Sequence, residues 1–463
     1  MEEMMIHDNV WTTYSDADIR ELEHLSSGYI DFLNNGKTER ECTDLLVEMA
    51  EKNGYRDLKE IIANGEELGR GSKIYAVNMG KAVMMLNIGD DIIRDGMNIL
   101  GAHLDSPRLD IKQNPLYESD ELAYLNTHYY GGVKKYHYVA LPLALHGVVC
   151  KTDGTTVKIS IGEKDDDPVF FVSDLLIHLS GKQLEKVAAK VIEGEDLDIL
   201  VGSRPLKGEE KDAVKKYILG FLRDNYGIEE DDFLSAELEA VPAGKARDAG
   251  LDRSMILGYG HDDRCCAYPS AVAMFDVPEV KTTACGLFVD KEEIGSVGAT
   301  GMESHFFEDM MREVLDRMGI YSELNLTRCF RNCRMLSSDV SAAFDPLYAD
   351  SFEKQNAAHF GHGLVFNKFT GSRGKSGSND ANAEYIAFLR SVLEKHNVAF
   401  QTAEMGKVDA GGGGTIAYIL SLYGMQVIDS GIAVLSMHAP WETISKADLF
   451  EAYKGYKAFI TEG

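Results

Sequence analysis

The chain has 463 residues, of which 44% are hydrophobic, so it can bury a large core and is long enough for two or three domains. Its 75 acidic and 47 basic side chains leave a formal charge of -28, which repels phosphate backbones and anionic lipids and argues against nucleic acid and membrane surfaces as partners. Seven cysteines without a disulfide framework, an N-terminus without an apolar leader and no apolar run of membrane-spanning length predict a cytoplasmic protein.

Two helices are expected first, over residues 16–34 and 38–53, because apolar side chains recur there at helical spacing. Residues 73–89 predict two strands around an Asn-Met-Gly turn, and residues 95–105 predict the next strand, which ends at a histidine and an aspartate. The first 108 residues therefore predict the beginning of an α/β domain.

The pattern of predicted elements changes near residue 109. Residues 148–162 predict a hairpin around Asp153-Gly154, and a charged, helix-forming stretch follows. Beyond residue 250, short apolar strands alternate with helices, which is typical of a sheet covered by helices on both faces. We therefore expect one α/β domain in two parts, 1–108 and 251–463, and an inserted domain over 109–250.

Five short stretches place acidic or imidazole side chains at the end of a predicted strand or in the loop after it. They span residues 101–110, 258–264, 289–296, 335–341 and 434–440. Because the carboxyl ends of strands in open α/β sheets face the ligand crevice, the five stretches are expected to converge on one site. Any one acid is ordinarily solvated and any one histidine structural, but several buried charges together favour a bound cation. Mixed imidazole and carboxylate ligands suit zinc, cobalt or manganese better than calcium.

Two spacings within these stretches have a chemical reason. In His103-x-Asp105, the carboxylate can accept the second ring N–H of a metal-binding imidazole. In Glu292-Glu293, adjacent side chains of an extended segment point in different directions, so one carboxylate can bind metal while its neighbour acts as a base on water.

With these motifs in this order, the chain resembles the aspartyl aminopeptidase and vacuolar aminopeptidase I family of two-zinc exopeptidases, and within it the bacterial branch. The resemblance covers nearly the whole chain, from residues 73–89 to residues 430–442. It implies a mixed sheet sandwiched between helices, an inserted β-rich dimerisation domain, and dimers within a closed dodecamer. The implied activity is hydrolysis of the N-terminal residue from peptides.

The same resemblance implies two divalent metal ions per chain. Asp262 would bridge them, His103 and Asp339 would complete one site, and Glu293 and His438 would complete the other.

The resemblance also implies which residues act on the substrate. Glu292 falls at the position of the general base, Asp105 at that of the carboxylate behind the histidine, and Lys368 near the substrate. In the glycine run 411–414, Gly412 and Gly413 would let the substrate backbone approach closely, since glycine has no Cβ.

Three alternatives stay open at this stage. Asp263 rather than Asp262 is the alternative bridging acid. A related two-metal hydrolase of N-acyl or C-terminal substrates would favour an arginine clamp for a carboxylate, with Arg264 and Arg373 as possible donors. A catalytically silent assembly protein on the same fold is the third, and the retained Glu292 argues against it.

Overall fold

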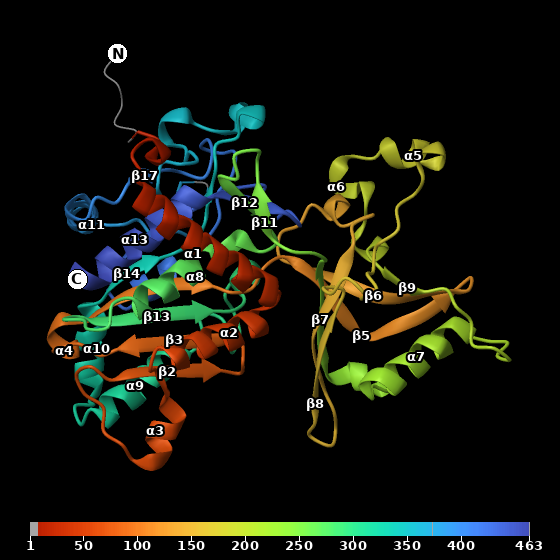
Figure 1. Cartoon of the computed structure of the whole chain (residues 1–463), viewed down its shortest axis with the longest axis horizontal. Coiled ribbons are helices and arrows are strands. Elements are labelled where there is room, and N and C mark those ends of the chain that lie inside the picture. The colour runs from red at the N-terminus through yellow and green to blue at the C-terminus, as the bar shows by residue number, and fades with distance from the viewer. Residues whose placement is uncertain (1–7, 373, 463) are drawn as a thin grey trace. The chain divides into compact units, whose positions relative to one another are not determined.

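The computed structural model describes residues 8–372 and 374–462, which fold into two compact units (Figure 1). Among these residues, the larger unit comprises 8–105, 246–437 and 442–462, and the inserted unit comprises 106–245 and 438–441. The sequence predicts an insertion over 109–250, so its predicted start lies three residues after the observed start and its predicted end lies five residues after the observed end. Residues 438–441, which the sequence assigns to the second part of the α/β domain, belong to the inserted unit. In the described part of the chain, no helix is both long enough and apolar enough to cross a membrane.

A nine-stranded mixed sheet forms the centre of the larger unit, which confirms the mixed sheet that the resemblance implies. Its strands, in spatial order, are β1 (Arg56–Asp57), β2 (Lys73–Asn78), β3 (Ala82–Asn87), β13 (Thr283–Val289), β4 (Met97–His103), β14 (Arg334–Ser337), β18 (Gln426–Gly431), β16 (Leu364–Asn367) and β17 (Phe400–Thr402). Strands β13, β4, β14 and β18 run parallel, whereas β3 and β16 lie antiparallel on either side of them. The carboxyl ends of four neighbouring strands therefore lie at one edge of the sheet.

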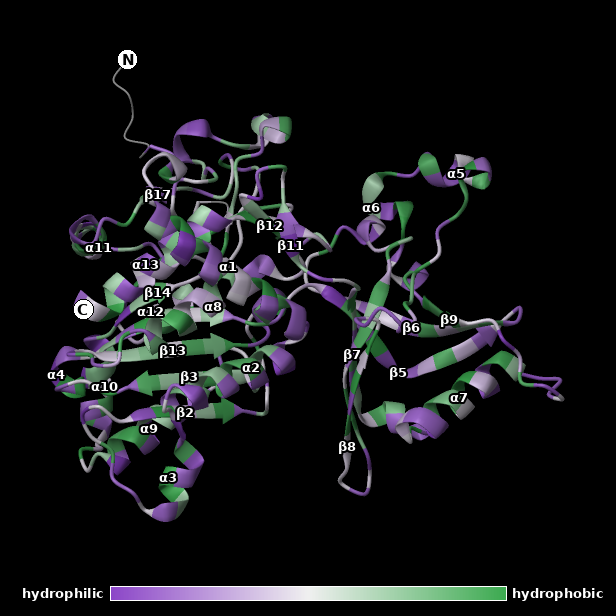
Figure 2. Ribbon diagram, in the orientation of Figure 1, coloured by the Kyte–Doolittle hydropathy of each residue, from purple (hydrophilic) through white to green (hydrophobic). Residues whose placement is uncertain are grey.

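Helices cover both faces of this sheet (Figure 1). One face carries α1 (Asp16–Asn35), α2 (Glu39–Lys52), α8 (His261–Phe275), α11 (Ala383–Lys395) and α13 (Lys446–Glu462), and the other carries α3 (Leu58–Asn64), α9 (Phe306–Arg317), α10 (Glu323–Arg331) and α12 (Ala417–Ser421). In β4, Leu100 and Ala102 face the first core, whereas Met97 and Ile99 face the second, as the alternation of side chains along a strand requires. Burial on both faces explains why the central strands are hydrophobic along most of their length (Figure 2).

The first two helices confirm the sequence prediction closely, and each begins at a capping box. Ser15 accepts a hydrogen bond from the backbone N–H of Asp18, whose carboxylate accepts one from the backbone of Ser15. Thr38 and Glu41 form the same reciprocal pair at the start of α2. These bonds satisfy N–H groups that have no partner inside a helix and thereby fix where each helix begins.

A smaller five-stranded sheet also belongs to the larger unit. Its order is β11 (Arg247–Ala249), β12 (Met255–Gly258), β20 (Glu442–Ser445), β19 (Ala433–Leu435) and β15 (Ser341–Ala342). The strands before residues 259–264 and 436–440 thus lie in this sheet, whereas β4, β13 and β14 lie in the nine-stranded sheet. A hydrophobic period identifies a strand but not the neighbour with which it pairs.

The inserted unit contains an antiparallel sheet of six strands and its own core. The order is β8 (Thr156–Ile161), β7 (Leu143–Cys150), β10 (Ala236–Pro242), β5 (Arg108–Ser119), β6 (Leu122–Tyr130) and β9 (Ile199–Gly202), with α7 (Ala213–Tyr226) as its longest helix. Strands β7 and β8 form the predicted hairpin, whose turn contains Gly154 with a φ of 87°. Short helices complete the chain: α4 (Ile92–Asp95) in the larger unit, and α5 (Gly181–Leu184) and α6 (Ala188–Val191) in the inserted unit.

Candidate metal centre and active site

His103, the last residue of β4, lies at the centre of a buried acidic cluster. Its Nδ1 is 2.9 Å from the backbone oxygen of Asp105 and 3.3 Å from the Oδ1 of the same residue. Its Nε2 is 3.2 Å from Oδ1 of Asp262 and 3.9 Å from Oε2 of Glu292. A proton on Nδ1 would leave the Nε2 lone pair directed at the acids, which is the arrangement that a metal-binding imidazole requires.

Asp105 holds the glutamate pair through the backbone. It is fully buried, and its Oδ1 and Oδ2 accept hydrogen bonds of 3.1 Å from the N–H groups of Glu292 and Glu293, respectively. The two glutamates begin a short 3-10 helix over Glu292–Ile294, which follows Lys291 in a left-handed conformation with a φ of 69°. One carboxylate therefore fixes both the imidazole and the acidic turn.

The two aspartates at the start of α8 have different partners. Both have non-helical backbone angles, and the peptide bond between them is cis. The N–H of Asp262 donates to Oε2 of Glu442 at 3.0 Å, which leaves its side chain beside His103. Oδ2 of Asp263 accepts a hydrogen bond of 3.3 Å from the backbone N–H of His103.

Two groups of possible metal ligands share His103. Ligand atoms of His103, Glu292 and Asp339 lie within 4.8 Å of one another, and so do those of His103, Asp262 and Glu293. Asp339 lies between β14 and β15, next to Gly431, where an added Cβ would lie 1.9 Å from the Asp339 backbone oxygen. The structure thus brings together residues from four of the five predicted stretches.

The electrostatics of this cluster favour a cation. Burial and then the charges of Asp339 and neighbouring acids raise the pKa of Glu292 to about 8, although His103 opposes that shift. Burial alone would lower the pKa of His103, but hydrogen bonds to Asp105 and Asp262 outweigh it and raise the pKa well above its ordinary value. Four carboxylates and an imidazole at this distance fit zinc, which takes nitrogen and oxygen ligands and neutralises their mutual repulsion.

Among the described residues, the candidate ligand groups around His103 do not include the remaining predicted residues. His438 belongs to the inserted unit, where its Nδ1 lies 2.8 Å from the backbone oxygen of Gly132. Lys368 is exposed, forms an ion pair with Asp380 and lines a largely apolar cavity of about 250 Å³.

The glycine run contacts the loop that follows Lys368. The N–H of Gly413 donates to the backbone oxygen of Thr370 at 3.2 Å, and a Cβ on Gly412 would lie 2.9 Å from the Cα of Ser372. Gly412 has a φ of 144°, so its lack of a side chain is used to bring two loops together. The helix that follows this run, α12, has five residues.

Sequence reasoning missed two buried acids of the site region, Asp429 and Glu442. Asp429 in β18 accepts a 2.5 Å hydrogen bond from Thr415, and burial raises its pKa to about 7. Asp429 follows the apolar residues of a strand. The other acids were found because they follow apolar strands, so the same pattern could have identified Asp429. No comparable signal marks Glu442, whose contact with Asp262 joins residues 180 positions apart.

Comparisons with known proteins place the chain in a family. A family model described as aminopeptidase I zinc metalloprotease (M18) matches residues 32–460. A probable M18 family aminopeptidase 1 of Clostridium acetobutylicum is 59% identical over 453 residues, which cover 98% of this chain and 97% of that protein. The crystal structure of an M18 family aminopeptidase from Thermotoga maritima matches with a TM-score of 0.95 and 42% identity, over 99% of this chain and 100% of that chain. The crystal structure of aminopeptidase I from Clostridium acetobutylicum matches with a TM-score of 0.92 and 56% identity, over 98% and 99% of the two chains.

The fold and the mixed histidine and carboxylate cluster are those of a metal-dependent peptide hydrolase. The chain belongs to the M18 family of zinc metallo-aminopeptidases, which confirms the resemblance read from its motifs.

Proposed function

We propose that this chain removes the N-terminal residue from peptides with two metal ions that share the carboxylate of Asp262. The observation that supports this most directly is the pair of ligand groups that meet at His103. Bound zinc ions supply Lewis-acid activation of the scissile carbonyl and of water.

The ligand roles are those that the resemblance to the family implies. His103, Asp262 and Asp339 would hold one ion, and Asp262, Glu293 and His438 would hold the other. Asp262 is the bridging acid rather than Asp263, since the carboxylate of Asp263 is directed at the backbone N–H of His103.

Glu292 is the general base. It takes the proton of the attacking water and passes it to the leaving amine. Asp105 acts as a positioning residue, because its two oxygens hold the backbone of Glu292 and its neighbour Glu293 while it orients His103. Lys368, Gly412 and Gly413 contact the substrate backbone or side chain.

We propose further that the inserted unit mediates self-association into dimers within a dodecamer. Large apolar side chains are exposed along one segment of this unit: Leu175, Leu176, Ile177, Leu179, Leu184 and Val187. Such a surface is typical of a protein contact. A structure of the S. cerevisiae mApe1 dodecamer has the same fold, with a TM-score of 0.75. A cytoplasmic location accords with the seven cysteines, none of which forms a disulfide in the structure as described.

The alternative hydrolase of N-acyl or C-terminal substrates has less support. Arg264 is buried, and its Nε and Nη2 donate to the backbone oxygens of Leu104 and Lys37, so those donors are not directed at a substrate carboxylate. Arg373 lies outside the described residues.

Metal removal and re-addition test the proposal. The chain is stripped with a chelator, supplied with zinc, cobalt or manganese, and assayed on aminoacyl substrates with free or acetylated α-amino groups. We expect activity to be lost and regained, to require the free amine, and to accompany about two ions per chain. Activity on acetylated substrates alone would favour the alternative hydrolase, and no activity with any metal would favour the silent assembly protein.

A further inference from the structure

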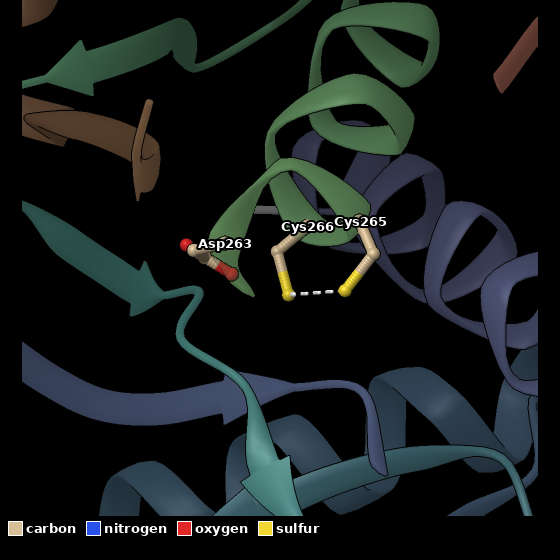
Figure 3. Close-up of side chains that lie close together, drawn as sticks. All are labelled: Asp263, Cys265 and Cys266. Atoms are coloured by element: carbon tan, nitrogen blue, oxygen red, sulfur yellow. Dashed lines mark hydrogen bonds between the residues drawn. The ribbon is translucent and has the colours of Figure 1, made fainter. Parts of the chain in front are cut away.

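The first turn of α8 holds a second cluster of possible metal ligands, formed by Asp263, Cys265 and Cys266. All three side chains are fully buried. One ligand atom from each lies within 4.8 Å of the others, and the two sulfur atoms are 4.0 Å apart. Figure 3 shows the two sulfur atoms directed toward each other, with Asp263 beside Cys266.

The sulfur separation suits one shared ion. Two thiolates on a tetrahedral zinc ion, each at about 2.3 Å, lie roughly 3.8 Å apart, and a larger ion such as cadmium widens that distance slightly. The observed 4.0 Å therefore needs almost no movement of either side chain.

The carboxylate of Asp263 provides an independent reason for a cation here. Its Oδ2 accepts the hydrogen bond from the backbone N–H of His103, and beyond the thiol of Cys266 its buried Oδ1 has no hydrogen-bond partner among the described residues. A bound divalent cation would give this buried oxygen a stronger partner than a thiol.

A second cysteine pair of the chain lacks these features. Cys329 and Cys333 are also buried, but the thiol of Cys333 donates to the backbone oxygen of Cys329 at 3.1 Å. Among the described residues, no candidate metal group includes this pair. It therefore offers a matched control.

We propose that Asp263, Cys265 and Cys266 bind one further thiophilic divalent ion, of the class of zinc or cadmium, and that this ion inhibits the peptidase. On binding, each thiol releases its proton to solvent as a metal–sulfur bond forms, with no change of oxidation state, and the carboxylate supplies a third ligand. Because Oδ2 of Asp263 accepts a hydrogen bond from the backbone N–H of His103, an ion bound to Asp263 would shift the position of His103 at the end of β4. The inhibitory part rests on the proposed function, whereas the binding part does not.

Cadmium loading tests the binding. The experiment uses the full chain with Cys150→Ser, which removes the one cysteine that is exposed in the structure as described. After long incubation with cadmium, which allows buried groups to open locally, bound metal is measured by elemental analysis and thiolate binding by ultraviolet charge-transfer absorption. We expect a thiolate band and one more ion per chain than in Cys150→Ser/Cys266→Ser, with Cys150→Ser/Cys329→Ser behaving like the parent.

Several outcomes would overturn the proposal. Absence of the thiolate band in the parent protein would overturn the proposal by itself. The test therefore does not depend on whether the Cys266→Ser variant folds. If the band were lost in Cys150→Ser/Cys329→Ser instead, the ion would be bound by Cys329 and Cys333, and the proposal would be wrong. Histidine and carboxylate ligands give no thiolate band, so failure here is distinguishable from failure of the two-metal proposal.

The inhibitory role has its own measurement. Excess cadmium or zinc should lower kcat/KM of the parent by about tenfold, the usual effect of disturbing an outer partner of a metal-binding histidine, and should have little effect on the Cys266 variant. Unchanged activity while the band forms would refute inhibition.

Discussion

Replacing Asp105 by asparagine should weaken the active site without removing any metal ligand or the base. The carboxylate accepts two backbone hydrogen bonds of 3.1 Å, from Glu292 and Glu293, and lies 3.3 Å from Nδ1 of His103. Asparagine keeps the shape but has one acceptor oxygen, so its NH₂ group must face one of the two N–H donors.

The magnitude follows from these contacts. A hydrogen bond to a charged acceptor contributes about 1.5 to 3 kcal/mol, and about 1.4 kcal/mol corresponds to a factor of ten. Loss of one such bond, together with the charge that orients His103, predicts a fall of about 10- to 100-fold in zinc affinity or in kcat/KM.

The assay measures kcat/KM on a free aminoacyl substrate and zinc per chain, each at limiting and saturating zinc. A fall that excess zinc reverses acts through His103, and one that persists acts through the backbone of Glu292. Asp309→Asn is the control, since the Asp309 side chain is 58% exposed on α9. If Asp105→Asn matched this control in both measurements, the positioning role of Asp105 would be refuted.

Three further predictions follow from other contacts. Glu292→Gln should keep both ions while kcat falls by about 10² to 10⁴, whereas Glu293→Gln should lose affinity chiefly for one ion. If elemental analysis showed that Glu292→Gln loses metal and Glu293→Gln keeps it, the two roles would be exchanged. Gly431→Ala places a Cβ 1.9 Å from the backbone oxygen of Asp339, so it should displace that ligand and lower both stability, by about 1 to 3 kcal/mol, and zinc content; unchanged urea midpoint and zinc content would contradict this. Burial raises the pKa of Asp448 to about 7, so the folded chain binds this proton more tightly than the unfolded chain, and stability should fall by up to about 4 kcal/mol as pH rises from about 4 to 7. Asp448→Asn should flatten that slope in urea unfolding, and an unchanged slope would disprove the assignment.

Much of the fold could be predicted because its local signals agree with its burial. The helices over 16–34 and 38–53 have apolar side chains at helical spacing and polar caps, and the structure has helices over almost the same residues. The strand that ends at His103 is buried on both faces, which gave it a continuous apolar run in the sequence.

The acidic cluster could be predicted in part for a related reason. His103, Asp262, Glu292 and Asp339 interrupt apolar surroundings, and the structure brings their side chains together. Contacts that join distant segments gave no local signal. The pairing of β12 and β19 with β20 in a second sheet, and the bond between Glu442 and the backbone of Asp262, depend on packing that a single sequence does not specify.

The order of elements along the chain has a consequence for synthesis. The strands β5 to β10 of the inserted unit, with their own core, are complete once residue 245 has been made. The larger unit cannot close its core until α13 is available, because 12 of the 17 residues of that helix are buried against elements that were made much earlier. During translation the inserted unit can therefore fold while the first part of the larger unit still waits with exposed apolar strands, which makes nascent chains shorter than about 460 residues the stage most prone to aggregation.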